Sequence, residues 1–231
     1  MINSISESNV HVKNLHIQTA VIANSTFHRL GIVLSLKETE VYKETLDFMN
    51  FTNFENYIRK TDYKPDVVII DIYKLGMCIY KIIKTLKKSY AEIRILIMSS
   101  CTNTLGITKM LEYGADGYIT EDSSKEDLII ALDELLETGT FLPNNIKNAV
   151  LLHYRNAIKK NIFLTERDLE FLSYSTHELT HKEIAERMYV SPRTIDKIVK
   201  DLFYKTGHNS RTGLALFAAS IGLFQENDMN I

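Results

Sequence analysis

Residues 164–222 read LTERDLEFLSYSTHELTHKEIAERMYVSPRTIDKIVKDLFYKTGHNSRTGLALFAASIG, and this stretch decides the fold of the C-terminal part of the chain. It contains two helix signatures joined by a tight break, and the second of these helices is long and basic on one face. A supporting helix followed by such a helix is the arrangement of a helix-turn-helix, whose second helix enters the major groove of DNA. The stretch therefore predicts a DNA-binding module.

Residues that favour helix starts stand at three points of this stretch. Thr165 precedes an acidic first turn, which suits the unpaired backbone N–H groups and the helix dipole. Thr180 and Glu183 have the spacing of a capping box. Ser191 and Pro192 start the longest helix, because the missing N–H of proline costs nothing in a first turn. We therefore expect three helices that begin directly after these caps.

The helix after Ser191 has two faces. Its apolar residues recur at helical spacing and should be buried; they are Ile195, Ile198, Val199 and Leu202. The opposite face carries Arg193, Lys197, Lys200 and Tyr204, with Asp196 beside them. Cations there can neutralise phosphates, and side chains near the helix start can reach base edges. An ordinary solvated face would show the same charges, but the capped helix-turn-helix pattern favours DNA contact.

Three pieces of the stretch carry a family resemblance: LTERDLEFL (164–172), HKEIAERMYVSPRTID (181–196) and YKTGHNSRTGLALFA (204–218). They resemble the LuxR-type four-helix DNA-binding domain of NarL/FixJ response regulators. The resemblance implies that the helix after Ser191 is the recognition helix. It implies base contacts by Asp196, Lys197 and Lys200, and phosphate contacts by Lys182, Ser191, Arg193 and Thr194. It also implies that the last helix, around Ser210 to Ser220, pairs two subunits on DNA.

Two positions depart from the family pattern. Ile198 stands where the family often has histidine. Tyr189 stands in the turn, where helix-turn-helix proteins often have glycine. A non-glycine residue there costs about 1 kcal/mol if its φ is positive. Neither change removes a cation, so the DNA assignment stands.

The N-terminal half alternates five apolar runs with five amphipathic segments, which predicts a parallel sheet covered by helices on both faces. The expected strands lie in residues 15–23, 41–48, 65–71, 94–100 and 117–120, and the second of them has the weakest signal. The expected helices lie in residues 26–38, 51–60, 77–88, 105–114 and 124–139. Gly114 and Gly139 stand where helix C-caps belong, and either Ser123 or Ser124 caps the last helix.

The predicted fold class is therefore α/β plus all-α. A (βα)5 doubly wound domain, residues 15–140, follows a flexible tail, residues 1–14. Residues 141–160 form a linker, partly helical and basic, after a break at Pro143. Residues 161–226 form the four-helix domain.

PDVVIID, RILIMSS and YGADGYIT make residues 17–140 resemble the receiver domain of response regulators. In that family a phosphoryl group moves from a histidine kinase to an aspartate that ends the third strand, and Asp71 occupies this position. The resemblance also places Mg²⁺ ligands after the first strand and a lysine after the fifth. Here these positions hold Ala23, Asn24 and Glu121. Mg²⁺ needs oxygen ligands, chiefly carboxylates, and a carboxylate at residue 121 repels phosphate.

The loop after Asp71 has also changed, with Leu75 and Ile79 where the family usually has proline and then glycine. Ser99 and Tyr118 keep the positions of the family's switch hydroxyl and switch aromatic. Phosphoryl transfer depends on positioning and charge neutralisation. We therefore expect a pseudo-receiver that ordinary phosphorylation does not control, with Asp71 as a leftover carboxylate.

The composition sets further limits. The chain has 231 residues, 45% of them hydrophobic, and a net charge of −2, so any DNA contact must come from a local basic patch. Cys78 and Cys101 have no metal or redox spacing, and we expect no metal and no cofactor. The polar N-terminus lacks a signal core, and no apolar run reaches the ~18 residues that span a bilayer. A cytoplasmic protein is expected.

The hypothesis that fits best is a sequence-specific DNA-binding transcription regulator that acts as a homodimer on DNA. A partner regulator or RNA polymerase is a further candidate partner. The alternatives are an interaction adaptor and a conventional two-component regulator phosphorylated on Asp71. An enzyme that uses Asp71 as nucleophile lacks a base, a metal cluster and a Gly-rich phosphate loop. The operator, the target genes, the sign of regulation, the input and the oligomeric state off DNA are not given by the sequence.

Overall fold

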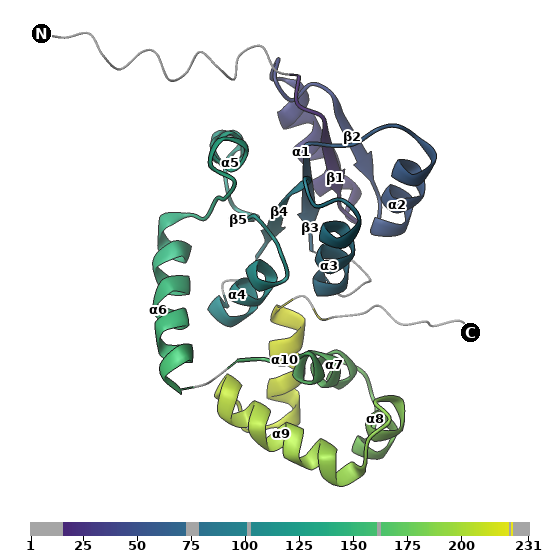
Figure 1. The fold of residues 1–231 in the computed structure, drawn as a ribbon, viewed down its shortest axis with the longest axis vertical. Helices are drawn as coiled ribbons and strands as arrows, with labels where there is room; N and C mark the ends of the chain where they lie inside the picture. The colour runs from purple at the N-terminus through teal and green to yellow at the C-terminus, as the bar shows by residue number, and fades with distance from the viewer. Residues whose placement is uncertain (1–15, 73–78, 101–102, 161–162, 222, 224–231) are drawn as a thin grey trace, which may run out of the picture. The chain divides into compact units, whose positions relative to one another are not determined.

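The computed structural model describes residues 16–72, 79–100, 103–160, 163–221 and 223 (Figure 1). The expected tail, Leu75, Cys78 and Cys101 lie outside these residues. The chain forms two compact units. Unit 1 consists of Met1–Tyr73, Ile83–Ser100 and Gly114–Leu142, and unit 2 consists of Lys74–Ile82, Cys101–Tyr113 and Pro143–Ile231.

Unit 1 contains a five-stranded sheet in the order β2-β1-β3-β4-β5, and every neighbouring pair is parallel. The strands are β1 (Thr19–Ile22), β2 (Thr45–Phe48), β3 (Val67–Asp71), β4 (Arg94–Ser99) and β5 (Gly117–Thr120). Nearly all their residues are buried, as expected for a parallel sheet covered on both faces. The predicted fold class is confirmed, and the weakest expected strand is present as β2.

Helices cover both faces of this sheet. Helices α1 (Thr26–Lys37) and α5 (Lys125–Thr138) pack on one face, where their apolar residues form a single cluster with inward-facing residues of β1, β3, β4 and β5. Helix α2 (Phe51–Lys60) packs on β2, with the rings of Phe48 and Phe54 edge to face at 5.3 Å. Helix α3 spans Ile79–Ser89; its residues up to Ile82 belong to unit 2 and its residues from Ile83 belong to unit 1. Because every parallel strand is followed by a helix, the carboxyl ends of the strands meet at one edge of unit 1.

Helices α5 and α4 (Thr104–Glu112) end, and α5 begins, at or next to the cap residues that the sequence predicts. Ser124, not Ser123, caps α5 and forms a capping box with Asp127. Gly139 is the C-cap of α5 with φ 84°, in the left-handed region that glycine enters without strain. Helix α4 has Tyr113 as its C-cap, and Gly114 follows with φ 109°.

Unit 2 is helical. Besides α4, it contains α6 (Asn144–Lys160), α7 (Glu166–Ser175), α8 (His181–Arg187), α9 (Pro192–Thr206) and α10 (Arg211–Ser220). Helix α6 is a single 17-residue helix that packs against α4, where only a partly helical linker was predicted. Helices α7, α9 and α10 pack on one another, and α8 packs on α9. Within the described residues, no helix combines the length and the apolar character that a membrane span needs.

Candidate functional site

Helices α8 and α9 form a helix-turn-helix. The side chain of Thr180 accepts the backbone N–H of Glu183, and the Glu183 carboxylate accepts the N–H of Thr180, so the predicted capping box is present. The Thr180 hydroxyl also donates to this carboxylate at 2.7 Å, and this hydrogen bond, together with the one from the backbone N–H, holds the pKa of Glu183 below its usual value. Three residues, 188–190, make the turn, and Ser191 then caps α9 while Pro192 takes its first position. The local sequence thus fixes where each helix begins.

Tyr189 lies in this turn with φ 53°, and among the described residues it is the one non-glycine residue with a positive φ. Its side chain is 96% exposed, so no burial compensates for the strain. The backbone N–H of the next residue, Val190, donates to the carbonyl of Ala185 at 2.9 Å and holds the turn closed. Ala185 is buried, and its small side chain allows this close approach.

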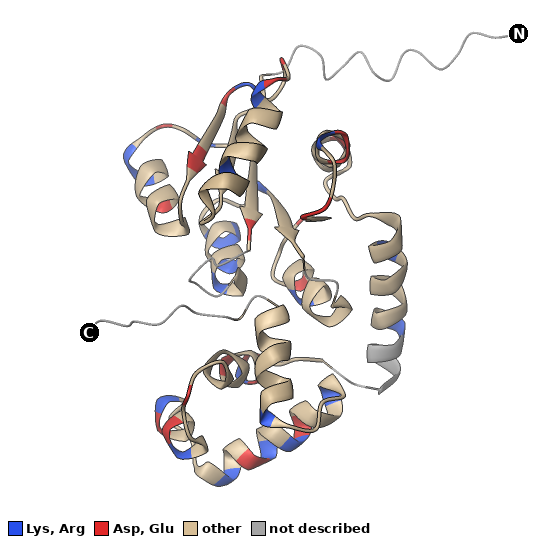
Figure 2. Cartoon of the chain, turned by 180° about the vertical axis from the view of Figure 1, so that it is seen from behind, with Lys and Arg blue, Asp and Glu red and all other residues tan. Residues whose placement is uncertain are grey.

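Helix α9 divides into the two faces that the sequence predicts. Ile195, Ile198 and Leu202 are buried, and Val199 is half-buried. The other face is exposed and contains Arg193, Asp196, Lys197, Lys200 and Tyr204. Figure 2 shows basic and acidic residues along α8 and α9. Arg193, Lys197 and Lys200 pair with no carboxylate among the described residues, so their charges face solvent.

The remaining predicted contact residues lie at the start of α8 and α9. Lys182 is exposed in the first turn of α8. The hydroxyl groups of Ser191 and Thr194 lie 2.9 Å apart, and Ser191 also accepts the N–H of Thr194. Asp196 lies 3.4 Å from Nδ1 of His181, which is the first residue of α8. A base contact by Asp196 therefore competes with this pairing.

A buried ion pair joins α9 to α7. Nζ of Lys205 lies 2.7 Å from the Asp168 carboxylate and 2.6 Å from that of Asp201. Burial disfavours the ammonium, but the hydrogen bonds with the two carboxylates outweigh it, and the pKa of Lys205 is raised. Asp168 also accepts the backbone N–H of Thr165 and so completes the capping box of α7. One carboxylate thus fixes both the start of α7 and its packing against α9.

The receiver-like site lies at the carboxyl ends of the strands of unit 1. Asp71 ends β3, as predicted, and is fully buried. Its carboxylate lies 3.1 Å from Nδ1 of His28, which stands in the first turn of α1. An imidazole therefore lies against this carboxylate.

The side chains around Asp71 do not fit a magnesium ion. Ala23 carries no oxygen in its side chain, Asn24 is neutral, and Asp71 already has the His28 imidazole as a neighbour. Glu121 follows β5, and one of its oxygens accepts the backbone N–H of Ser100 at 2.9 Å. A hard cation prefers several anionic oxygens. This donor set supplies one buried carboxylate where a receiver places three, and we derive no metal-dependent step from it.

The two switch positions lie side by side. Ser99 and Tyr118 are both buried, and the Tyr118 hydroxyl donates to the carbonyl of Ser99 at 3.1 Å. The ring of Tyr118 is therefore held inside unit 1.

Sequence reasoning missed His28. Its partner Asp71 lies 43 residues further along the chain, and a single histidine in an amphipathic helix carries no signal of its own. Only the register of β1 beside β3 brings the start of α1 to the end of β3.

Comparison with known proteins agrees with both parts of the chain. Residues 163–218 match the family described as "Bacterial regulatory proteins, luxR family". The nitrate/nitrite response regulator protein homolog of Haemophilus influenzae is 27% identical over 165 residues, which cover 71% of this chain and 76% of that protein. RcsB from Salmonella enterica serovar Typhimurium, in a structure described as bound to the promoter rprA, superposes with a TM-score of 0.64. The two are 20% identical, over 88% of this chain and 98% of that one. A second structure is described as two RcsB dimers bound to two parallel DNAs. It superposes with a TM-score of 0.58 at 21% identity, and the match covers 89% of this chain and 98% of that one.

A parallel five-stranded receiver-like sheet followed by a helix-turn-helix defines the class of two-part response regulators. Within this class, residues 163–218 match the luxR family, and over most of its length the chain is similar to response regulators that regulate transcription.

Proposed function

We propose that the protein regulates transcription by binding specific double-stranded DNA through the exposed face of α9. The observation that carries this proposal is the row of exposed cations Arg193, Lys197 and Lys200 on α9, which pair with no carboxylate in the described part of the chain. Helix α9 is the capped second helix of the helix-turn-helix. Lys197, Lys200 and Asp196 are proposed to face bases. Arg193, Thr194, Ser191 and Lys182 are proposed to lie near phosphates, with Tyr204 at the far end of the same face.

We also propose a homodimer on DNA, paired through α10. Leu216 on this helix is 67% exposed, although Leu214 and Phe217 beside it are buried. An exposed leucine on a helix with an otherwise buried apolar side suits contact with a second copy. The proposal further includes a cytoplasmic location and no enzymatic activity, as the class of transcription regulators suggests.

The first prediction concerns salt. Purified, unphosphorylated protein should bind selected fragments of its own genome, and the affinity should fall steeply between two salt concentrations, because binding releases counterions from phosphates. Lys200→Ala should weaken binding, and Lys197→Ala should change the preferred sequence at the position that residue 197 reads. Electrophoretic mobility shifts with a fragment library measure both effects.

Lys147→Ala is the matched control, because Lys147 is an exposed lysine on α6 and its loss changes the net charge equally. Unchanged binding by both α9 variants would mean that DNA contacts another surface of the protein. Selective complexes with proteins instead of DNA would support the hypothesis of an interaction adaptor.

We propose that Asp71 is not a conventional phosphoacceptor. Ala23 and Asn24 replace the carboxylates that would hold Mg²⁺, and Glu121 replaces the lysine that would neutralise a phosphoryl group. His28 also lies against the Asp71 carboxylate. Incubation with acetyl phosphate and Mg²⁺ is therefore expected to leave Asp71 unmodified. Intact-mass spectrometry with an Asp71→Asn control detects an adduct, and a stoichiometric, acid-labile one would establish the conventional two-component regulator.

A further inference from the structure

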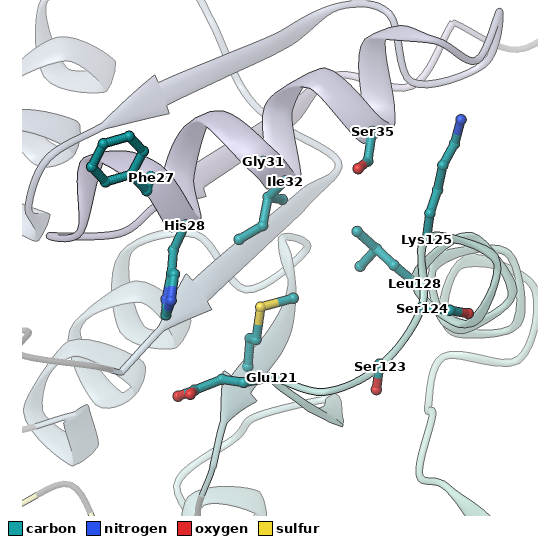
Figure 3. A pocket seen from close by; sticks show the side chains of 11 residues that line it. Phe27, His28, Gly31, Ile32, Ser35, Glu121, Ser123, Ser124, Lys125 and Leu128 are labelled. Atoms are coloured by element: carbon teal, nitrogen blue, oxygen red, sulfur yellow. The ribbon is translucent and has the colours of Figure 1, made fainter.

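A cavity of about 280 Å³ lies between α1 and the start of α5 in unit 1 (Figure 3). It is close to the lower end of the ~300–1,000 Å³ range of small-molecule sites. It opens at the carboxyl ends of the strands, which is where ligands bind in open α/β sheets. Met98 near the end of β4 and Glu121 after β5 both contribute to its lining.

One part of the cavity wall is apolar, and polar residues such as Ser35 and Ser123 line the rest. Ile32 from α1 and Leu128 from α5 face one another across it in Figure 3, and both are buried in the core cluster that also holds Met98. The thioether of methionine adapts to the shape of different apolar partners. The cavity has room for a ligand whose apolar part is a single ring or a short alkyl chain.

Gly31 keeps the α1 side of the cavity open. A glycine in the middle of a helix weakens that helix, so its presence calls for a packing reason. No neighbour comes within 4 Å of a Cβ built at Gly31, so close packing is not that reason. Gly31 lines the cavity, and a side chain at this position would extend into space that is now open.

The charges of the lining favour a cation. Nδ1 of His28 faces the Asp71 carboxylate, and Lys125 forms an ion pair with Glu38. Glu121 has no ion pair among the described residues and accepts only a backbone N–H. An anion at the start of α5 would also meet the Asp127 carboxylate, which already occupies the capping box there.

We propose that this cavity binds a small organic amine. Its apolar body lies between Ile32, Met98 and Leu128, and its ammonium group donates to the Glu121 carboxylate. The residue that would repel a phosphoryl group thus becomes the specificity determinant for a cation. Glu121 is the one carboxylate in the lining, so a metal ion would lack ligands.

Binding can be measured on the full-length protein labelled with [methyl-13C]methionine. The Met98 signal is assigned with a Met98→Leu variant, and Met188 in the helix-turn-helix serves as an internal reference. The probes are 3-phenylpropylamine, n-hexylamine and the matched carboxylate 3-phenylpropionate. We expect at least one amine to shift the Met98 signal saturably and leave Met188 in place, and we expect 3-phenylpropionate to bind at least about tenfold more weakly.

Two variants connect this binding to the cavity. Gly31→Leu should abolish the shift, because the leucine fills the cavity without meeting a neighbour at its Cβ. Glu121→Gln should lower the affinity for the amine about tenfold or more, through the loss of a charge-assisted hydrogen bond. Glu126→Gln removes the same charge from an exposed position outside the lining and should leave the affinity unchanged.

The proposal is overturned if neither amine binds, if Gly31→Leu binds as well as the wild-type protein, or if the carboxylate binds better than the amines. An unchanged Met188 signal shows that a variant is folded in unit 2, and circular dichroism checks unit 1. Because the measurement uses no DNA, its outcome is independent of the DNA-binding proposal.

Discussion

Tyr189 shows how one residue can carry strain in an otherwise well-capped motif. Its φ of 53° costs an L-amino acid about 1–2 kcal/mol, and its side chain is too exposed to recover this through burial. Strain of this kind persists where the surrounding structure determines the backbone, and it gathers at functional sites. Here Ser191 caps α9 directly after the turn, and the hydrogen bond from the backbone N–H of Val190 to the carbonyl of Ala185 closes the turn.

Tyr189→Gly is therefore expected to stabilise unit 2 by about 0.5–1 kcal/mol, because glycine adopts a positive φ freely while its greater entropy in the unfolded chain offsets part of the gain. Urea denaturation followed by circular dichroism measures the change. Tyr189→Ala keeps the strain and should show no gain. A loss of stability with glycine would mean that the tyrosine side chain makes a stabilising contact.

At the scale of the element, the packing of α9 against α7 depends on one buried ion pair. Lys205 and Asp168 are 10% and 4% exposed, and Asp168 also caps α7. Removing one partner of a buried pair leaves the other charge uncompensated. The pair therefore anchors the recognition helix to the helix that supports it.

Lys205→Met is expected to destabilise unit 2 by about 2–4 kcal/mol. Because the pKa of Lys205 is raised in the folded protein, the pair contributes fully at neutral pH, and its contribution is lost as the pH rises through that raised pKa. Hydrogen exchange of α7 and α9 peptides measures the loss. Lys200→Met, at an exposed position of the same helix, should change stability by no more than about 0.5 kcal/mol. Equal exchange in both variants would contradict the anchoring role.

The elements were predictable where their signal is local. Strands buried on both faces read as continuous apolar runs, and the caps Thr165, Thr180 and Ser191 stand next to the helices they start. The full length of α6 was not predictable, because its apolar side is defined by packing on α4, some 30 residues earlier in the chain. The contact between His28 and Asp71 likewise exists only once the strands are in register.

At the scale of the whole molecule, unit 2 brings together segments that are far apart in the sequence. The hydroxyl of Tyr80, a buried residue of α3, donates to the carbonyl of Ile221 at 3.0 Å, across 141 residues. A Cβ added to Gly106 of α4 would meet Cγ2 of the same isoleucine at 2.5 Å. The end of α10 is thus in close contact with both helices. The division into residues 15–140, 141–160 and 161–226 stays a prediction beside this grouping.

Gly106→Ala is expected to destabilise unit 2 by about 1–3 kcal/mol, because the added methyl group forces Ile221 away. Hydrogen exchange at the end of α10 should accelerate. Gly31→Ala is the matched control, since its Cβ meets no neighbour and it should stabilise α1 by up to about 1 kcal/mol. Equal exchange at α10 in the wild-type protein and Gly106→Ala would contradict the close approach.

The three-segment composition of unit 2 also bears on synthesis. A ribosome adds about 5–20 residues per second, so Ile221 is added about 6–23 s after Gly106. Unit 1 ends at Leu142, and its sheet can form while α10 has not yet been translated. The nascent chain is therefore expected to complete its sheet first and its helical unit last. Until Ile221 has been translated, Tyr80 and Gly106 lack the residue that they contact in the folded protein.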